Sequence, residues 1–265
     1  MVNTITIGQY VPAESIIHEL DPRTKIGAVT LLIVALFLVN SFTGYGLITG
    51  FLGVAILLSG LPVRFVMRSI RPLVIIIIFT FILNIFMTPG KTLLLLGPLQ
   101  VTDTGLYRGT FMSIRLVLLI LATSLLTLTT SPIRLTDGVE RILAPFKRVG
   151  VPAHELAMMM TIALRFIPTL LEETDRIMKA QMARGADFES GNLVGRAKNL
   201  VPLLVPLFIS AFRRADELAT AMEARCYRGD EGRTKLTQLV VRRVDVVALL
   251  ATVAFLTGTV IWFRV

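Results

Sequence analysis

Residues 26–63 read IGAVTLLIVALFLVNSFTGYGLITGFLGVAILLSGLPV and contain no Asp, Glu, Lys or Arg. An α-helix rises about 1.5 Å per residue, so about 20 apolar residues cross a hydrocarbon core about 30 Å thick. The run is therefore long enough for two crossings. The small, turn-forming residues at 41–46 (SFTGYG) predict that the chain reverses there. This stretch indicates an integral membrane protein.

Charge-free runs at 72–90, 116–133 and 246–263 add further crossings. We predict five spans, at about 26–42, 45–61, 72–89, 113–131 and 245–263. The fold class is then an all-α polytopic membrane protein with four spans within 1–131, a helical cytoplasmic or interfacial region at 132–243 and a last span within 244–265. Only 17% of the residues are charged, against about a quarter in soluble domains.

The net charge of +9 is explained by topology. Arg23 and Lys25 precede the first span, three arginines lie between the second and third, and eighteen Lys and Arg lie between the fourth and fifth. Under the positive-inside rule these segments are cytoplasmic. We therefore expect a multi-pass plasma-membrane protein with a cytoplasmic N-terminus, an external C-terminus and no nucleic-acid partner.

The external segment 91–110 contains two apolar stretches, 93–96 and 99–102, on either side of Gly97-Pro98. Because Gly-Pro is typical of a turn, a short β-hairpin is expected on the outer surface.

The region 132–243 is too long for a structureless loop and too apolar for disorder, so packed helices are expected. One helix is predicted at 153–182, where apolar residues recur every three or four positions. Another is predicted at 193–212, whose uncharged run 199–212 is interrupted by Pro202 and Pro206. It is either a sixth, broken crossing or a helix at the interface or in the core. We favour the second, because a crossing would separate two similar charged helix ends.

Those similar ends form an internal repeat. Asp175-x4-Ala180-x2-Ala183-Arg184-Gly185 is followed 41 residues later by Asp216-x4-Ala221-x2-Ala224-Arg225-Cys226. A small alanine lets a partner approach closely, and a guanidinium binds a carboxylate bidentately. The two ends are therefore either docking points for acidic grooves on a partner or arginines that complement their own helix dipoles.

Five stretches of the chain resemble a known family: 15–25 (SIIHELDPRTK), 101–106 (VTDTGL), 150–152 (GVP), 164–168 (LRFIP) and the paired Ala-Arg-Gly ends. The sequence is similar to the transmembrane T-component (EcfT/CbiQ-like) family of energy-coupling-factor (ECF) transporters, over nearly the whole chain. It departs from the family at Cys226, where Gly is usual.

The resemblance implies a scaffold that joins two cytoplasmic ABC ATPases to a membrane-embedded substrate-binding S-component, for uptake of a vitamin or metal. Residues 183–185 and 224–226, with Arg184 and Arg225 at their centres, would contact the ATPases. The chain would be a non-catalytic subunit without a cofactor of its own, since ATP and Mg²⁺ would bind to the partners.

The residues themselves agree with this implication. The sequence has no G-x-x-x-x-G-K-[ST] phosphate loop. His18, His154 and Cys226 show no metal-ligand spacing. An ordinary ABC permease with its own substrate path remains an alternative, but it would lack the paired ends. A membrane-embedded enzyme would need a cluster of acids or histidines that the sequence does not show.

Two short motifs have two interpretations each. Met158, Met159 and Met160 are either packing residues or an adaptable surface for a changing partner such as the S-component. Asp21-Pro22-Arg23 is either a partner contact or simply a helix N-terminus, with Pro22 at the first helical position.

Overall fold

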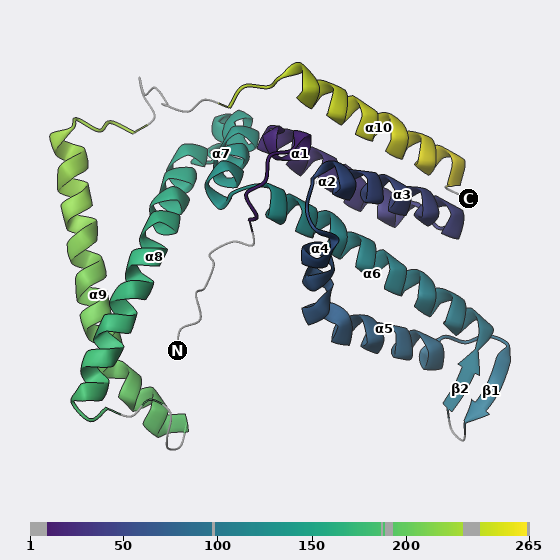
Figure 1. The fold of residues 1–265 in the computed structure, drawn as a ribbon, viewed down its shortest axis with the longest axis horizontal. Coiled ribbons are helices and arrows are strands. Elements are labelled where there is room, and N and C mark those ends of the chain that lie inside the picture. The colour runs from purple at the N-terminus through teal and green to yellow at the C-terminus, as the bar shows by residue number, and fades with distance from the viewer. Residues whose placement is uncertain (1–9, 97–98, 187, 189–192, 230–238, 264–265) are drawn as a thin grey trace. The chain divides into compact units, whose positions relative to one another are not determined.

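The computed structural model describes residues 10–96, 99–186, 188, 193–229 and 239–263. They divide into two compact units, one within Glu140–Gln238 and the other within Gly8–Val139 and Leu239–Val265. The helices, drawn in Figure 1, are α1 Ile16–Glu19, α2 Pro22–Leu38, α3 Phe42–Leu58, α4 Val63–Ile70, the 3₁₀ helix η1 Arg71–Leu73, α5 Val74–Met87, α6 Asp103–Thr129, α7 Pro132–Leu143, the 3₁₀ helix η2 Ala144–Val149, α8 Ala153–Ala183, α9 Leu193–Ala224 and α10 Arg243–Phe263.

Four helical stretches in the described part of the chain are long and apolar enough to cross a membrane: Val63–Met87, which joins α4, η1 and α5, together with α6, α8 and α10. Helices α2 and α3 have 17 residues each, at the short end of the range of about 17–25 for a crossing. The prediction of an all-α polytopic membrane protein is confirmed. Helix α8 is not among the five predicted spans.

The predicted reversal at 41–46 is wrong in its extent. Helix α2 ends at Leu38 and α3 already begins at Phe42. The Ser41 hydroxyl accepts a hydrogen bond from the Gly44 N–H at 3.2 Å and so caps α3. Because this cap lets α3 begin at Phe42, only residues 39–41 reverse the chain, and the glycines at 44 and 46 lie within the helix.

The predicted β-hairpin is confirmed in the backbone, whereas its location outside the membrane stays a prediction. Strand β1 (Thr92–Leu96) pairs with β2 (Leu99–Thr102) in antiparallel register, with Leu96 opposite Leu99. Gly97-Pro98, predicted as the turn, lies outside the described residues. In Figure 1 the hairpin connects α5 to α6.

The core of the larger unit lies among α2, α3, α6 and α10, where Leu36, Ile48, Leu118 and Leu256 are all buried. At one end of this core the rings of Tyr45 and Phe111 stack with centroids 4.4 Å apart. Arg115 of α6 donates from Nε to the Tyr45 hydroxyl at 2.6 Å and lies over the Phe111 ring. Aromatic contacts thus accommodate an arginine within a membrane-spanning helix.

Candidate functional site

Helices α8 and α9 form an antiparallel pair (Figure 1). Gln181 near the end of α8 donates to the carbonyl of Pro202, near the start of α9, at 3.4 Å. Further along, Arg214 of α9 donates to Glu173 of α8 at 2.9 Å. We call α8 and α9 the helix pair. It carries both Ala-Arg motifs of the sequence.

Helix α9 is longer than predicted. The expected segment 193–212 continues as one helix to Ala224, through Pro202 and Pro206. Proline lacks an N–H, so Pro206 leaves the carbonyl of residue 202 without its helical donor. The Gln181 side chain donates to this carbonyl from α8. The missing bond is thus replaced from the neighbouring helix, and α9 bends without ending.

The first motif, 183–185, closes the C-terminal end of α8. Gly185 N–H donates to Met182 O and Ala186 N–H to Gln181 O, both at 3.0 Å. Gly185 has a φ of 91°. These two bonds with a left-handed residue between them make up a Schellman motif, which satisfies the last carbonyls of the helix.

The second motif, 224–226, closes α9 with the same geometry. Cys226 N–H donates to Glu223 O at 2.9 Å and Tyr227 N–H to Met222 O at 3.0 Å. Cys226 has a φ of 56° and is the one described non-glycine residue with a positive φ. The repeat in the sequence is therefore a repeat in the structure, and Cys226 takes the left-handed conformation that Gly185 takes in the first copy.

Both arginines are available to a partner. Arg184 and Arg225 are exposed, as are the alanines that precede them. Neither guanidinium forms a hydrogen bond or an ion pair with another described residue. Since Gln181 lies beside Pro202 and Arg225 follows Pro202 by 23 helical positions, the two motifs lie roughly 35 Å apart along the helix pair.

The second motif is joined to the start of α8 by a chain of polar side chains. The Tyr227 hydroxyl donates to Met158 Sδ at 3.0 Å and lies 3.5 Å from His154 Nε2. The other ring nitrogen, Nδ1, lies 3.1 Å from Glu140 Oε1, and His154 is buried. This chain fixes the backbone directly after Cys226.

Sequence reasoning missed Gln181, His154 and Tyr227 as neighbours of the motifs. His154 and Tyr227 are 73 residues apart, and no local pattern indicates that they meet. They meet because α8 and α9 pair in antiparallel fashion. The sequence could have indicated this contact only if the full length of α9 had been predicted.

The two ambiguous motifs are explained differently. Met158 Sδ accepts a hydrogen bond from the Tyr227 hydroxyl, whereas Met159 and Met160 are about half exposed. One methionine therefore packs inside the unit and the other two lie at the surface. Asp21 is the N-cap of α2, with Pro22 at the first helical position, and accepts from Arg23 N–H at 2.9 Å. The Asp21 N–H donates to Asp245 of α10 at 2.6 Å. This motif is therefore a helix N-terminus, and a partner contact at the same residues stays a prediction.

The described residues hold no group of three His, Cys, Asp or Glu side chains placed to bind a metal ion. His18 lies in α1 of the larger unit, where Nε2 donates to the Val11 carbonyl and Nδ1 contacts the Ser15 hydroxyl. Burial lowers the pKa of His18. It anchors the segment that precedes α2.

Comparison with known proteins gives one consistent result. The family described as "Cobalt transport protein" (CbiQ) matches residues 13–236. The chain is 62% identical to a Thermosediminibacter oceani protein named "Energy-coupling factor transporter transmembrane protein EcfT", over 97% of both chains. Proteins of the same name from Ruminiclostridium cellulolyticum and Bacillus subtilis are 55% identical over 98% of both chains and 53% identical over 91% of both chains.

Proposed function

Since the chain belongs to the CbiQ family of energy-coupling factor transporter transmembrane proteins, we propose that it links two cytoplasmic ABC ATPases to a substrate-binding S-component for micronutrient uptake. The observation that carries this proposal is the pair of matching helix ends, each of which presents beside a small alanine an exposed arginine that has no partner among the described residues. A guanidinium in this setting is suited to a carboxylate in a groove of a partner protein.

The distance between the two ends supports a pair of partners. Ends roughly 35 Å apart do not fit into one acidic groove, but they suit one groove on each of two neighbouring subunits. Because α8 and α9 are joined along their length, a movement of one end is transmitted to the other. In this proposal ATP hydrolysis moves the helix pair, which acts in turn on the S-component.

The chain itself is then a non-catalytic subunit. ATP and Mg²⁺ bind to the partner ATPases, and the S-component selects the vitamin or metal ion that is imported. The exposed Met159 and Met160 of α8 are suited to a partner that changes orientation, since methionine side chains repack readily.

The test is the double variant Arg184→Ala, Arg225→Ala. Loss of one side of a buried charge-assisted contact costs about 2–5 kcal/mol, whereas an arginine that merely complements its own helix dipole contributes about 0.3–1 kcal/mol. We therefore expect normal membrane levels of the chain, loss of ATPase co-purification and loss of ATP-driven uptake. Each single variant should be milder, because the other end remains.

Arg213→Ala is the matched control, since Arg213 is another exposed arginine of α9 but lies away from both ends. It should leave assembly unchanged. Arg184→Lys with Arg225→Lys should restore little, because an ammonium does not bind a carboxylate bidentately. Normal uptake by the double alanine variant would refute the proposal, and so would its disappearance from the membrane, which would assign the arginines to folding.

A further inference from the structure

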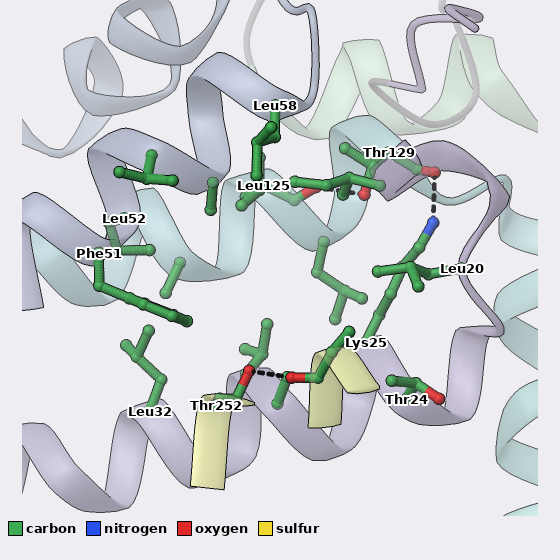
Figure 2. Close-up of a pocket in the computed structure, with 18 of the residues that line it drawn as sticks. Leu20, Thr24, Lys25, Leu32, Phe51, Leu52, Leu58, Leu125, Thr129 and Thr252 are labelled. Atoms are coloured by element: carbon green, nitrogen blue, oxygen red, sulfur yellow. Dashed lines mark hydrogen bonds between the residues drawn. The ribbon is translucent and has the colours of Figure 1, made fainter. Parts of the chain in front are cut away.

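A cavity of about 260 Å³ lies in the larger unit, between α1, α2, α3, α6 and α10 (Figure 2). Leu32, Phe51, Leu52 and Leu125 form much of its wall. It is open at one side, where the lining residues Val54 and Leu58 are more than half exposed. Because these helices lie in the membrane, the cavity opens to a medium of hydrocarbon chains rather than water.

Three of the four polar side chains in the wall, those of Lys25, Thr129 and Thr252, already have hydrogen-bond partners. Lys25 contributes its aliphatic stem, while its ammonium donates to Thr129 O at 2.9 Å (Figure 2). It also donates to Thr130 Oγ1 and to His18 O, both at 3.2 Å. The hydroxyls of Thr129 and Thr252 donate to carbonyls of their own helices. The cavity therefore suits an apolar chain and offers none of these groups to a polar ligand.

A second cavity, of about 280 Å³, shares Ile16 and Leu20 with the first. Its polar lining includes Glu14, Glu19 and Arg242, and the last two form an exposed ion pair at 3.1 Å. Glu14 is exposed and has no ion pair with another described residue. Asp245, also in the lining, is buried and accepts backbone N–H bonds from Asp21 and Arg242. The charged groups that a ligand can reach are therefore the Glu14 carboxylate and the exposed Glu19–Arg242 ion pair, which a ligand would have to exchange for its own contacts.

The two cavities together match one leaflet of a membrane, which is charged at its surface and apolar inside. The charged cavity lies between α1 and the start of α10, and the apolar one follows α2 from Thr24 to Leu32. Eight helical positions rise about 12 Å, which is close to the thickness of half a hydrocarbon core. A molecule that fills both cavities has a charged head at the membrane surface and a hydrocarbon tail within one leaflet.

We propose that the two adjacent cavities, which share Ile16 and Leu20, together bind one phospholipid with a primary-ammonium headgroup, of the phosphatidylethanolamine class. Its acyl chain occupies the apolar cavity, its phosphate pairs with Arg242, and its ammonium pairs with Glu14 and Glu19. When Arg242 turns from Glu19 to the phosphate, Glu19 becomes available to the ammonium, so every charge keeps a partner. An anionic headgroup without an ammonium would instead be repelled by two carboxylates and attracted by only one guanidinium. An apolar partner helix would make no contact with the charged residues of the second cavity.

The tail site is tested by Ala251→Trp in the full chain. Ala251 lines the apolar cavity, and the indole would occupy the space of the acyl chain. Ala254→Trp is the matched control, since Ala254 is also exposed and lies one turn further along α10 but does not line the cavity. Native mass spectrometry of the chain in detergent with added phosphatidylethanolamine should show one retained lipid in the wild type and in Ala254→Trp, and about tenfold less in Ala251→Trp.

The head site is tested with phosphatidylethanolamine and phosphatidylglycerol of matched acyl chains. The wild type should retain the first about tenfold better, and Glu14→Gln with Glu19→Gln should abolish this preference while both lipids still bind. Arg242→Gln should weaken both. These are exposed positions, so this arm holds even where Ala251→Trp fails to fold.

Equal or better retention of phosphatidylglycerol by the wild type would overturn the headgroup assignment. Unchanged retention in a folded Ala251→Trp variant would overturn the tail site. If the assembled transporter retains no phosphatidylethanolamine while the isolated chain does, the cavity belongs to a protein partner and the proposal is wrong.

Discussion

Cys226 occupies a backbone position that favours glycine. Its φ of 56° lies in the left-handed region, where the Cβ of an L-residue approaches the following carbonyl oxygen at a cost of about 1–2 kcal/mol. Gly185 holds the same position in the first motif without this cost. The Schellman bonds around Cys226 are formed nonetheless, at 2.9 and 3.0 Å, so the helix end keeps its geometry under local strain.

Replacement of this cysteine by glycine should therefore stabilise the chain. We expect Cys226→Gly to raise the free energy of unfolding by about 1 kcal/mol, measured by equilibrium denaturation in mixed micelles. Cys226→Ala is the control, because it removes the thiol but keeps a Cβ, and it should change little. If the alanine variant is stabilised as much as the glycine variant, the effect comes from the thiol and not from the backbone.

At the scale of elements, the helix pair depends on bonds that neither helix makes alone. Pro206 removes the N–H that would reach the carbonyl of residue 202, and Gln181 of α8 donates to that carbonyl at 3.4 Å. The same Gln181 contributes its own carbonyl to the cap of the first motif. The bend of α9 and the end of α8 are thus joined through one residue.

A double-mutant cycle measures this link. Gln181→Leu should lower the free energy of unfolding by about 0.5–1.5 kcal/mol, the usual net value of a hydrogen bond. In a Pro206→Ala background, residue 206 regains its N–H and supplies the missing donor, so the same substitution should cost almost nothing. In a Pro202→Ala background the penalty should persist, because that N–H reaches residue 198. An equal penalty in all three backgrounds would show that Gln181 acts elsewhere.

At the scale of the whole molecule, two criteria for membrane crossing, apolar length and charge, disagree about α8. Helix α8 is apolar and long enough to cross, yet the positive-inside rule places 132–243 in the cytoplasm. The antiparallel pairing allows an experiment to distinguish a helix pair that crosses the membrane from one that does not. Arg184 and Cys226 lie at opposite ends of the helix pair, so a crossing pair would place them on opposite sides of the membrane.

Cys226 is the only cysteine of the chain and is exposed, so it reports its own side. We expect a membrane-impermeant maleimide to label Cys226 in inside-out vesicles and not in intact cells. The variant Cys226→Ala, Arg184→Cys moves the single thiol to the other end and should behave identically. Labelling of the two thiols from opposite sides would mean that the helix pair spans the membrane.

Some features of this protein follow from the sequence alone because their causes are local. Charge-free runs of membrane-crossing length mark the apolar helices, and Gly97-Pro98 between two apolar stretches marks the hairpin. The repeat of Ala-Arg before residues 185 and 226 indicates the twin helix ends. Within the first two predicted spans, the position of the turn was missed, since the cap from Ser41 shortens it.

Tertiary structure alone decided the rest. The antiparallel pairing of α8 and α9 sets the two motifs at opposite ends, and it joins Gln181 to Pro202 and Tyr227 to Met158. The apolar cavity is lined by five helices, and its lining residues Ile16 and Thr252 lie more than 200 positions apart in the chain. Helical periodicity and turn residues describe neighbours within a few positions, whereas these contacts depend on which faces of distant helices meet, and no local pattern of residues encodes that choice.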